Sequence, residues 1–121
     1  MKKIKIAPPN SMFFLEDPQG GKSPAIDERS SRIWSTKSCI IVGCQAFVDG
    51  ETEFFASTSE HDILPAEPAF DGMLETPSLI VEISTSERQI LLRCEIQRHL
   101  TRVRIWTNDP SLPDHILAVF T

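Results

Sequence analysis

The sequence has no apolar run long enough to cross a membrane, and its start has none long enough to serve as a signal peptide. A membrane-spanning helix needs about 20 apolar residues, and the N-terminal run meets Pro8 and Pro9 before a signal-length segment develops. The cysteines Cys39, Cys44 and Cys94 are odd in number and lack Cys-x-x-Cys spacing. This pattern fits neither a disulfide framework nor a zinc ribbon. We therefore expect a cytoplasmic protein whose cysteines are reduced core residues.

The size and composition of the chain are those of an ordinary soluble domain. Its 121 residues suffice for one hydrophobic core, and 40% hydrophobic with 24% charged residues is close to the average for globular proteins. Residues 1–121 are therefore predicted to form a single domain.

Helical periodicity is nearly absent from the chain. Between residues 79 and 107, apolar and polar side chains alternate with a period of two, which is typical of half-buried strands. One helix candidate begins at Ser23, with Pro24 in its first turn, and extends no further than Ser31. Further strand-like runs lie at residues 4–7, 12–15, 32–35, 39–48, 51–57 and 116–120. The pattern predicts an all-β, mostly antiparallel β-sandwich of about eight short strands with at most one short helix.

Two hairpins are predicted within this sandwich. Asp49 and Gly50 suit a tight turn between the runs 39–48 and 51–57. A two-residue loop at Arg98 and His99 would pair residues 90–96 with residues 101–107. In that register Cys94 opposes Val103 on the buried face. The proline-containing segment 58–77 is predicted to be a long ordered loop across one end of the sandwich.

Charge is strongly segregated along the chain. No Lys or Arg occurs between Lys37 and Arg88, and the ten charged residues in that stretch are all acidic. Such a segment offers a basic protein a complementary field, so it predicts a partner-binding acidic face. The alternative is that these acids and the later arginines neutralise each other within the fold. The residues assigned to the acidic face are Asp49, Glu51, Glu53, Glu60 and Asp62.

A second candidate surface follows from the predicted hairpin of residues 90–107. Exposed Trp beside Arg is the composition of binding hot spots, so this outer face is predicted to bind a partner or to form a homodimer. The alternative is that Trp106 is covered by the second sheet or by the 58–77 loop. The residues of this predicted face are Leu91, Arg93, Arg102, Arg104 and Trp106.

No residue set in the sequence matches a catalytic or metal site, so neither an enzyme nor a cofactor is predicted. The leading hypothesis is a non-enzymatic protein-binding module, with an inhibitor or immunity-type role towards a basic partner. The net charge of −5 argues against binding nucleic acid, and nothing indicates a membrane partner. Two alternatives stay open: a structural homo-oligomeric protein, and a small metal-assisted hydrolase using His61, Asp62 and His115.

Overall fold

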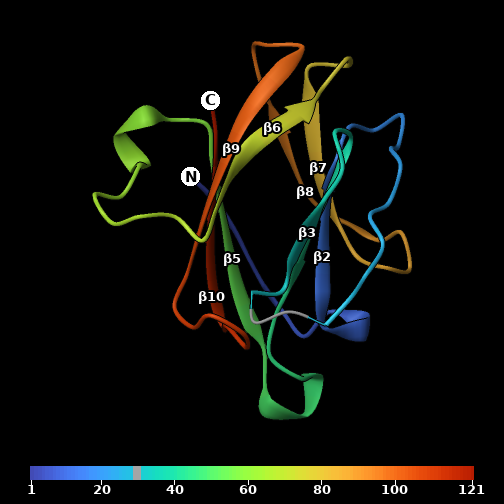
Figure 1. Cartoon of the computed structure of the whole chain (residues 1–121), viewed down its shortest axis with the longest axis vertical. Coiled ribbons are helices and arrows are strands. Elements are labelled where there is room, and N and C mark those ends of the chain that lie inside the picture. Colours follow the sequence, from blue (N-terminus) through green and yellow to red (C-terminus); the bar gives the residue numbers. More distant parts are fainter. Residues whose placement is uncertain (29–30) are drawn as a thin grey trace.

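The protein is a two-layer β-sandwich (Figure 1). The computed structural model describes residues 1–28 and 31–121, and in those residues ten strands form two five-stranded sheets. In spatial order, sheet A contains β1 (Lys2–Ile6), β5 (Thr52–Ser57), β10 (His115–Phe120), β9 (Leu100–Thr107) and β6 (Phe70–Glu75). Sheet B contains β3 (Ile33–Ser35), β4 (Cys39–Gly43), β2 (Met12–Glu16), β7 (Ile80–Ser84) and β8 (Ile90–Glu95).

The predicted fold class is confirmed. Strands β5 and β10 run parallel, and the other described strand pairs are antiparallel. Helical structure in the described residues consists of short 3-10 turns: η1 (Pro9–Ser11), η2 (Phe47–Asp49) and η3 (Glu60–Asp62). Residues 23–28 of the predicted helix are not helical, and residues 29 and 30 of that segment lie outside the described part of the chain. No helix of the described residues has the length and apolar character needed to span a bilayer.

The core lies between the two sheets and is built by the period-two alternation of their strands. Phe13 of sheet B and Phe54 of sheet A are both fully buried, and their ring centroids are 4.9 Å apart. A smaller cluster of Trp34, Cys39 and Ile41 packs together with Met12 and Phe14 on sheet B. Strand β4 is therefore buried on both faces, as its consecutive apolar residues predict.

The pairing of the C-terminal strands was predicted wrongly. Strand β8 pairs with β7 in sheet B, whereas β9 pairs with β6 and β10 in sheet A. Residues 96–99 therefore connect the two layers, and Cys94 pairs with Val81 and not with Val103. Strands β7 and β8 form a hairpin, in whose turn the Arg88 N–H donates to the Thr85 carbonyl at 2.9 Å.

Two other connections also differ from the predictions. The Asp49–Gly50 turn joins β4 of sheet B to β5 of sheet A, so it does not close a hairpin within one sheet. The segment 58–77 is not loop throughout, because it contains the edge strand β6, which is paired with β9.

Asp17 joins the end of β2 to the start of β7. The Ser78 N–H and hydroxyl donate to its carboxylate at 2.7 and 2.8 Å, and the Gln19 N–H donates at 2.9 Å. Burial alone would raise the pKa of Asp17, but these hydrogen bonds outweigh it and hold the pKa below the ordinary 3.8. The folded state therefore favours the ionised carboxylate.

Replacing Asp17 by alanine is expected to lower the free energy of unfolding by about 1–3 kcal/mol at neutral pH, because three donors lose their acceptor. A lowered folded-state pKa stabilises the fold above the unfolded pKa, and this contribution is lost as the pH falls through the folded value. Urea unfolding should therefore show that the difference in free energy of unfolding between the wild type and Asp17→Ala becomes smaller as the pH falls. A difference unchanged down to about pH 2, well below the ordinary carboxyl pKa, would contradict the linkage.

Candidate functional site

The predicted acidic face is divided between the two ends of strand β5. Asp49 and Glu51 precede the strand, whereas Glu60 and Asp62 follow it in η3. Six residues of strand span about 17 Å at about 3.3 Å per residue, so the two pairs cannot form one compact surface.

The other two members of the predicted face are engaged within the fold. Glu53 lies on β5 between its neighbours β1 and β10, with carboxylate oxygens 4.0 Å from the Lys3 ammonium and 3.9 Å from the His115 ring. Asp62 accepts a hydrogen bond from the Ser57 hydroxyl at 2.5 Å. These contacts leave Asp49, Glu51 and Glu60 as the exposed acids of the predicted set.

Two neighbouring loops at the start of β5 carry acidic side chains. We call loops 44–51 and 108–114 together the acidic end. Figure 1 shows the η2 turn (green) extending beyond the strands, with the connection from β9 to β10 at the same end. The Gln45 N–H donates to the Pro113 carbonyl at 2.9 Å, and the Glu53 N–H donates to the Asp114 carbonyl at 2.8 Å. The first hydrogen bond joins the two loops, and the second joins loop 108–114 to the start of β5.

Within the two loops of the acidic end all charged side chains are acidic, and the neighbouring Arg32 guanidinium donates to the Cys44 carbonyl at 3.0 Å. Asp49, Glu51, Asp109 and Asp114 lie there, and neither loop contains Lys or Arg. Hydrogen bonds from the Leu112 and Ser111 N–H groups lower the pKa of Asp109. Hydrogen bonds from His115 and Asn108 lower the pKa of Asp114. Both carboxylates therefore stay ionised at and well below neutral pH.

The five residues predicted to form one face of the hairpin 90–107 lie in two different sheets. Leu91 and Arg93 belong to β8 in sheet B, whereas Arg102, Arg104 and Trp106 belong to β9 in sheet A. The hairpin register on which self-association through this face depended is therefore wrong.

Two arginines instead neutralise acids of the central segment. The Arg93 guanidinium donates to Glu82 on the neighbouring strand β7, with a shortest N–O distance of 2.5 Å. Arg102 binds both carboxylate oxygens of Asp71 on β6, at 2.9 and 2.7 Å. In these two pairs, acids of residues 38–87 and later arginines neutralise each other within the fold, which is the alternative that the sequence left open.

Trp106 is covered rather than exposed. Its side chain is 7% exposed, and its indole N–H donates to the Ala66 carbonyl at 2.8 Å. Of the two alternatives left open by the sequence, cover by the segment between β5 and β6 is the one found.

The histidines predicted for an alternative metal site are not brought together. His61 and Asp62 lie in η3, beyond the end of β5, whereas His115 pairs in register with Glu53 near the start of that strand. The His115 ring instead contacts its neighbour Asp114, with 2.8 Å between Nδ1 and the carboxylate. Within residues 1–28 and 31–121, no three His, Cys, Asp or Glu side chains gather closely enough to hold a metal ion.

The cysteines are free, buried thiols, as predicted. Burial raises the pKa of Cys44 and Cys94, and burial beside Glu16 raises that of Cys39 to about 12. None of them is therefore a thiolate nucleophile near neutral pH.

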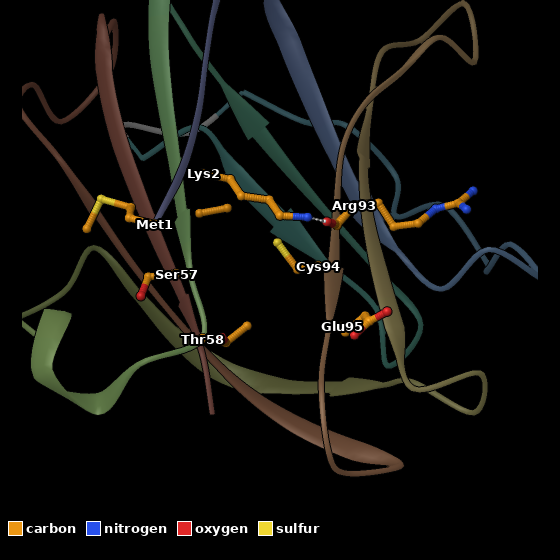
Figure 2. A pocket seen from close by; sticks show the side chains of 8 residues that line it. Met1, Lys2, Ser57, Thr58, Arg93, Cys94 and Glu95 are labelled. Carbon is orange, nitrogen blue, oxygen red and sulfur yellow. Dashed lines mark hydrogen bonds between the residues drawn. The ribbon is translucent and has the colours of Figure 1, made fainter.

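A cavity of about 410 Å³ opens between the edges of the two sheets. Figure 2 shows Lys2 reaching across it to the Arg93 carbonyl, to which its ammonium donates, while the Arg93 guanidinium points away. Cys94 and Glu95 also line the cavity, from β8. Ser57 and Thr58 also line the cavity, and burial raises the pKa of the Cys94 thiol, so Cys94 stays protonated near neutral pH.

A larger cleft, of about 650 Å³, lies along sheet B beside the loop that follows β2. Glu16 and Glu82 are cross-strand neighbours in its lining, together with serine and threonine side chains. Burial is the main reason that the pKa of Glu16 is raised, with a smaller contribution from Glu82. Sequence reasoning did not find this cleft, because its two carboxylates are brought together only by the pairing of β2 with β7.

Comparison with known proteins identifies a fold relative. No protein-family model and no curated protein sequence matches the chain. A solved structure does: the crystal structure of ComJ from Bacillus subtilis, an inhibitor of the DNA-degrading activity of NucA. It superposes with a TM-score of 0.70 at 10% sequence identity, over 99% of this chain and 94% of ComJ. At this identity the likeness shows a shared fold across nearly the whole of both chains.

Proposed function

We propose that this chain is a non-enzymatic binding protein that inhibits a basic nuclease by occupying its nucleic-acid-binding surface with the acidic end. The observation that carries the proposal is the one-signed charge of loops 44–51 and 108–114, which no Lys or Arg of either loop offsets. A nuclease binds the phosphate backbone through Lys and Arg. Carboxylates held at one end of a rigid sandwich present a competing set of anions to that same surface.

The fold likeness supports this proposal independently of charge. ComJ, which has the same sandwich fold, inhibits the DNA-degrading activity of a nuclease. The free, buried thiols suit a reducing compartment, so we place this activity in the cytoplasm. There an immunity-type inhibitor would protect the cell's own DNA from a nuclease before its export or activation.

Affinity capture followed by an activity assay tests the proposal. The immobilised full-length chain should retain a basic nuclease from an extract of the native host. The purified nuclease should then degrade plasmid DNA, and stoichiometric addition of the chain should suppress that degradation. Retention of no basic protein, or unchanged degradation by the retained one, would count against the function.

Charge reversal at the acidic end is expected to slow complex formation. In Asp49→Lys/Glu51→Lys the association rate constant should fall by about tenfold or more at low ionic strength, and its salt dependence should flatten. Stopped-flow mixing with the captured nuclease measures both quantities. The matched control is Glu60→Lys/Glu67→Lys, which makes the same charge change at exposed residues between β5 and β6. Equal slowing in both variants would indicate a net-charge effect and remove the acidic end as the docking site.

A further inference from the structure

The acidic end also carries exposed apolar side chains. Val48 is 80% exposed and Phe47 is 67% exposed, and both lie in the η2 turn. Leu112, in the neighbouring loop, is 53% exposed. We call Phe47, Val48 and Leu112 the apolar tip. Two adjacent large apolar residues held in water at the end of a turn make no contribution to the core, so packing within the fold does not account for them.

The loop that carries Phe47 and Val48 is held in one shape. The Gln45 side-chain amide donates to the Glu51 carbonyl at 3.1 Å and closes the loop at its base. Within the turn, the Asp49 N–H donates to the Ala46 carbonyl at 2.9 Å. Gly50, with φ of +117°, reverses the chain where a side chain would be strained. A loop ordered before binding loses little conformational entropy when it binds.

The second loop is ordered by its own acids. One Asp109 carboxylate oxygen accepts hydrogen bonds from the Ser111 and Leu112 N–H groups, at 3.0 and 2.9 Å. The Asn108 side-chain carbonyl accepts from the Asp114 and His115 N–H groups, both at 3.1 Å. The groups that hold Leu112 outward therefore include a carboxylate that charges the surface around it.

An apolar centre surrounded by charge has the anatomy of a protein–protein binding site. We infer that the apolar tip is the anchor of the complex: Phe47 and Val48 enter an apolar recess beside the cationic surface of a basic nuclease, while the surrounding carboxylates pair with that surface. The inference rests on the proposed function and adds the residues that set the lifetime of the complex.

The charge around the apolar tip favours a basic protein as the binding partner and disfavours a second copy of this chain. A symmetric dimer through the tip would bring Asp49, Glu51, Asp109 and Asp114 of two chains together, with no Lys or Arg in either loop to separate them. Like charges in a desolvated contact are unfavourable, whereas a cationic partner removes that cost.

Polar substitution of the tip tests the inference on the full-length chain with the nuclease captured above. Phe47→Ser/Val48→Ser should raise the dissociation constant at least about 100-fold, mainly through faster dissociation, and should leave the salt dependence of association unchanged. The matched control, Met73→Ser/Leu100→Ser, removes two half-exposed apolar side chains from β6 and β9 and should bind as the wild type does. Circular dichroism melting curves confirm that both variants are folded.

The possible results separate the inference from the proposed function. If the tip variant binds within about threefold of wild type while Asp49→Lys/Glu51→Lys binds weakly, the anchor is wrong and the electrostatic proposal stands. If neither variant changes binding, the complex forms elsewhere and both fall. If the wild-type chain captures and inhibits no basic nuclease, the proposed function fails and the inference fails with it.

Discussion

Replacing Trp106 by alanine is expected to lower the free energy of unfolding by about 3–5 kcal/mol, the usual range for truncating a buried aromatic side chain. Trp106 lies on the outer face of β9, where an exposed residue would contribute little, yet only 7% of it is accessible to solvent. The Ala66 carbonyl accepts its indole N–H at 2.8 Å, so the substitution removes both apolar contact and a hydrogen bond. Denaturant unfolding followed by circular dichroism measures the loss.

The control Trp106→Phe separates these two contributions. Phenylalanine keeps much of the buried area but loses the hydrogen bond and the part of the ring system that carries it, so the expected cost is smaller, about 1–2 kcal/mol. Limited proteolysis between residues 58 and 69 should accelerate in Trp106→Ala more than in Trp106→Phe, because the indole holds that segment at Ala66. If Trp106→Ala lowered the free energy of unfolding by less than about 1 kcal/mol, Trp106 would behave as an exposed residue that is available for binding.

Trp106 also illustrates what strand periodicity can predict. Alternation correctly assigned Cys94 and Val103 to the buried side, where they are 3% and 0% exposed. It could not identify the strand that lies beside each one. A hairpin within one sheet and a crossing between two sheets place the same residues inward, and residues 96–99 are long enough to cross the roughly 10 Å between packed sheets. The choice depends on which strands flank each one: β8 pairs with the preceding strand β7, whereas β9 pairs with β6 and β10.

Strand β6 was missed because its inward positions are atypical of a strand. Phe70, Gly72 and Leu74 pair with the inward residues of β9, so glycine interrupts the apolar side of the alternation. A Cβ at Gly72 would lie 2.7 Å from the Phe70 ring, which explains why this position has no side chain. Nearby prolines strengthened the interpretation as a loop, and an edge strand tolerates such neighbours.

Charge order along the chain predicted that acids would matter but not which of them face outward unopposed. Glu82 and Asp71 come from the same acidic segment as Asp49, yet strand pairing places them beside Arg93 and Arg102. Asp109 and Asp114 lie outside that segment, and their loop is brought to the loop of Asp49 by the hydrogen bond between Gln45 and Pro113. The acidic end is therefore a product of tertiary structure. The sequence indicates this end locally through the Asp49–Gly50 turn, but the run 39–48 predicts a strand for the adjacent Phe47 and Val48.

Replacing Phe54 by alanine is expected to destabilise the sandwich by about 3–5 kcal/mol. Phe54 is fully buried on β5 and meets Phe13 of the opposite sheet with ring centroids 4.9 Å apart and an interplanar angle of 48°. Its removal leaves a cavity at the contact between the layers, and a close-packed core fills such a cavity only in part. Since small domains are stable by about 5–15 kcal/mol, the change removes a large fraction of the total.

A double-mutant cycle isolates the contribution of the ring pair from that of burial. Phe54→Leu, which keeps most of the volume, should cost less than about 1.5 kcal/mol beyond the lost ring contact. Phe54→Ala combined with Phe13→Ala should destabilise by less than the sum of the single variants, with a coupling of about 0.5–1.5 kcal/mol. Chemical unfolding of the wild type, the two single alanine variants and the double variant gives the four free energies of the cycle. Strict additivity would mean that the two rings act as separate core residues, and the contact between the layers would then have to be sought in the aliphatic side chains around them.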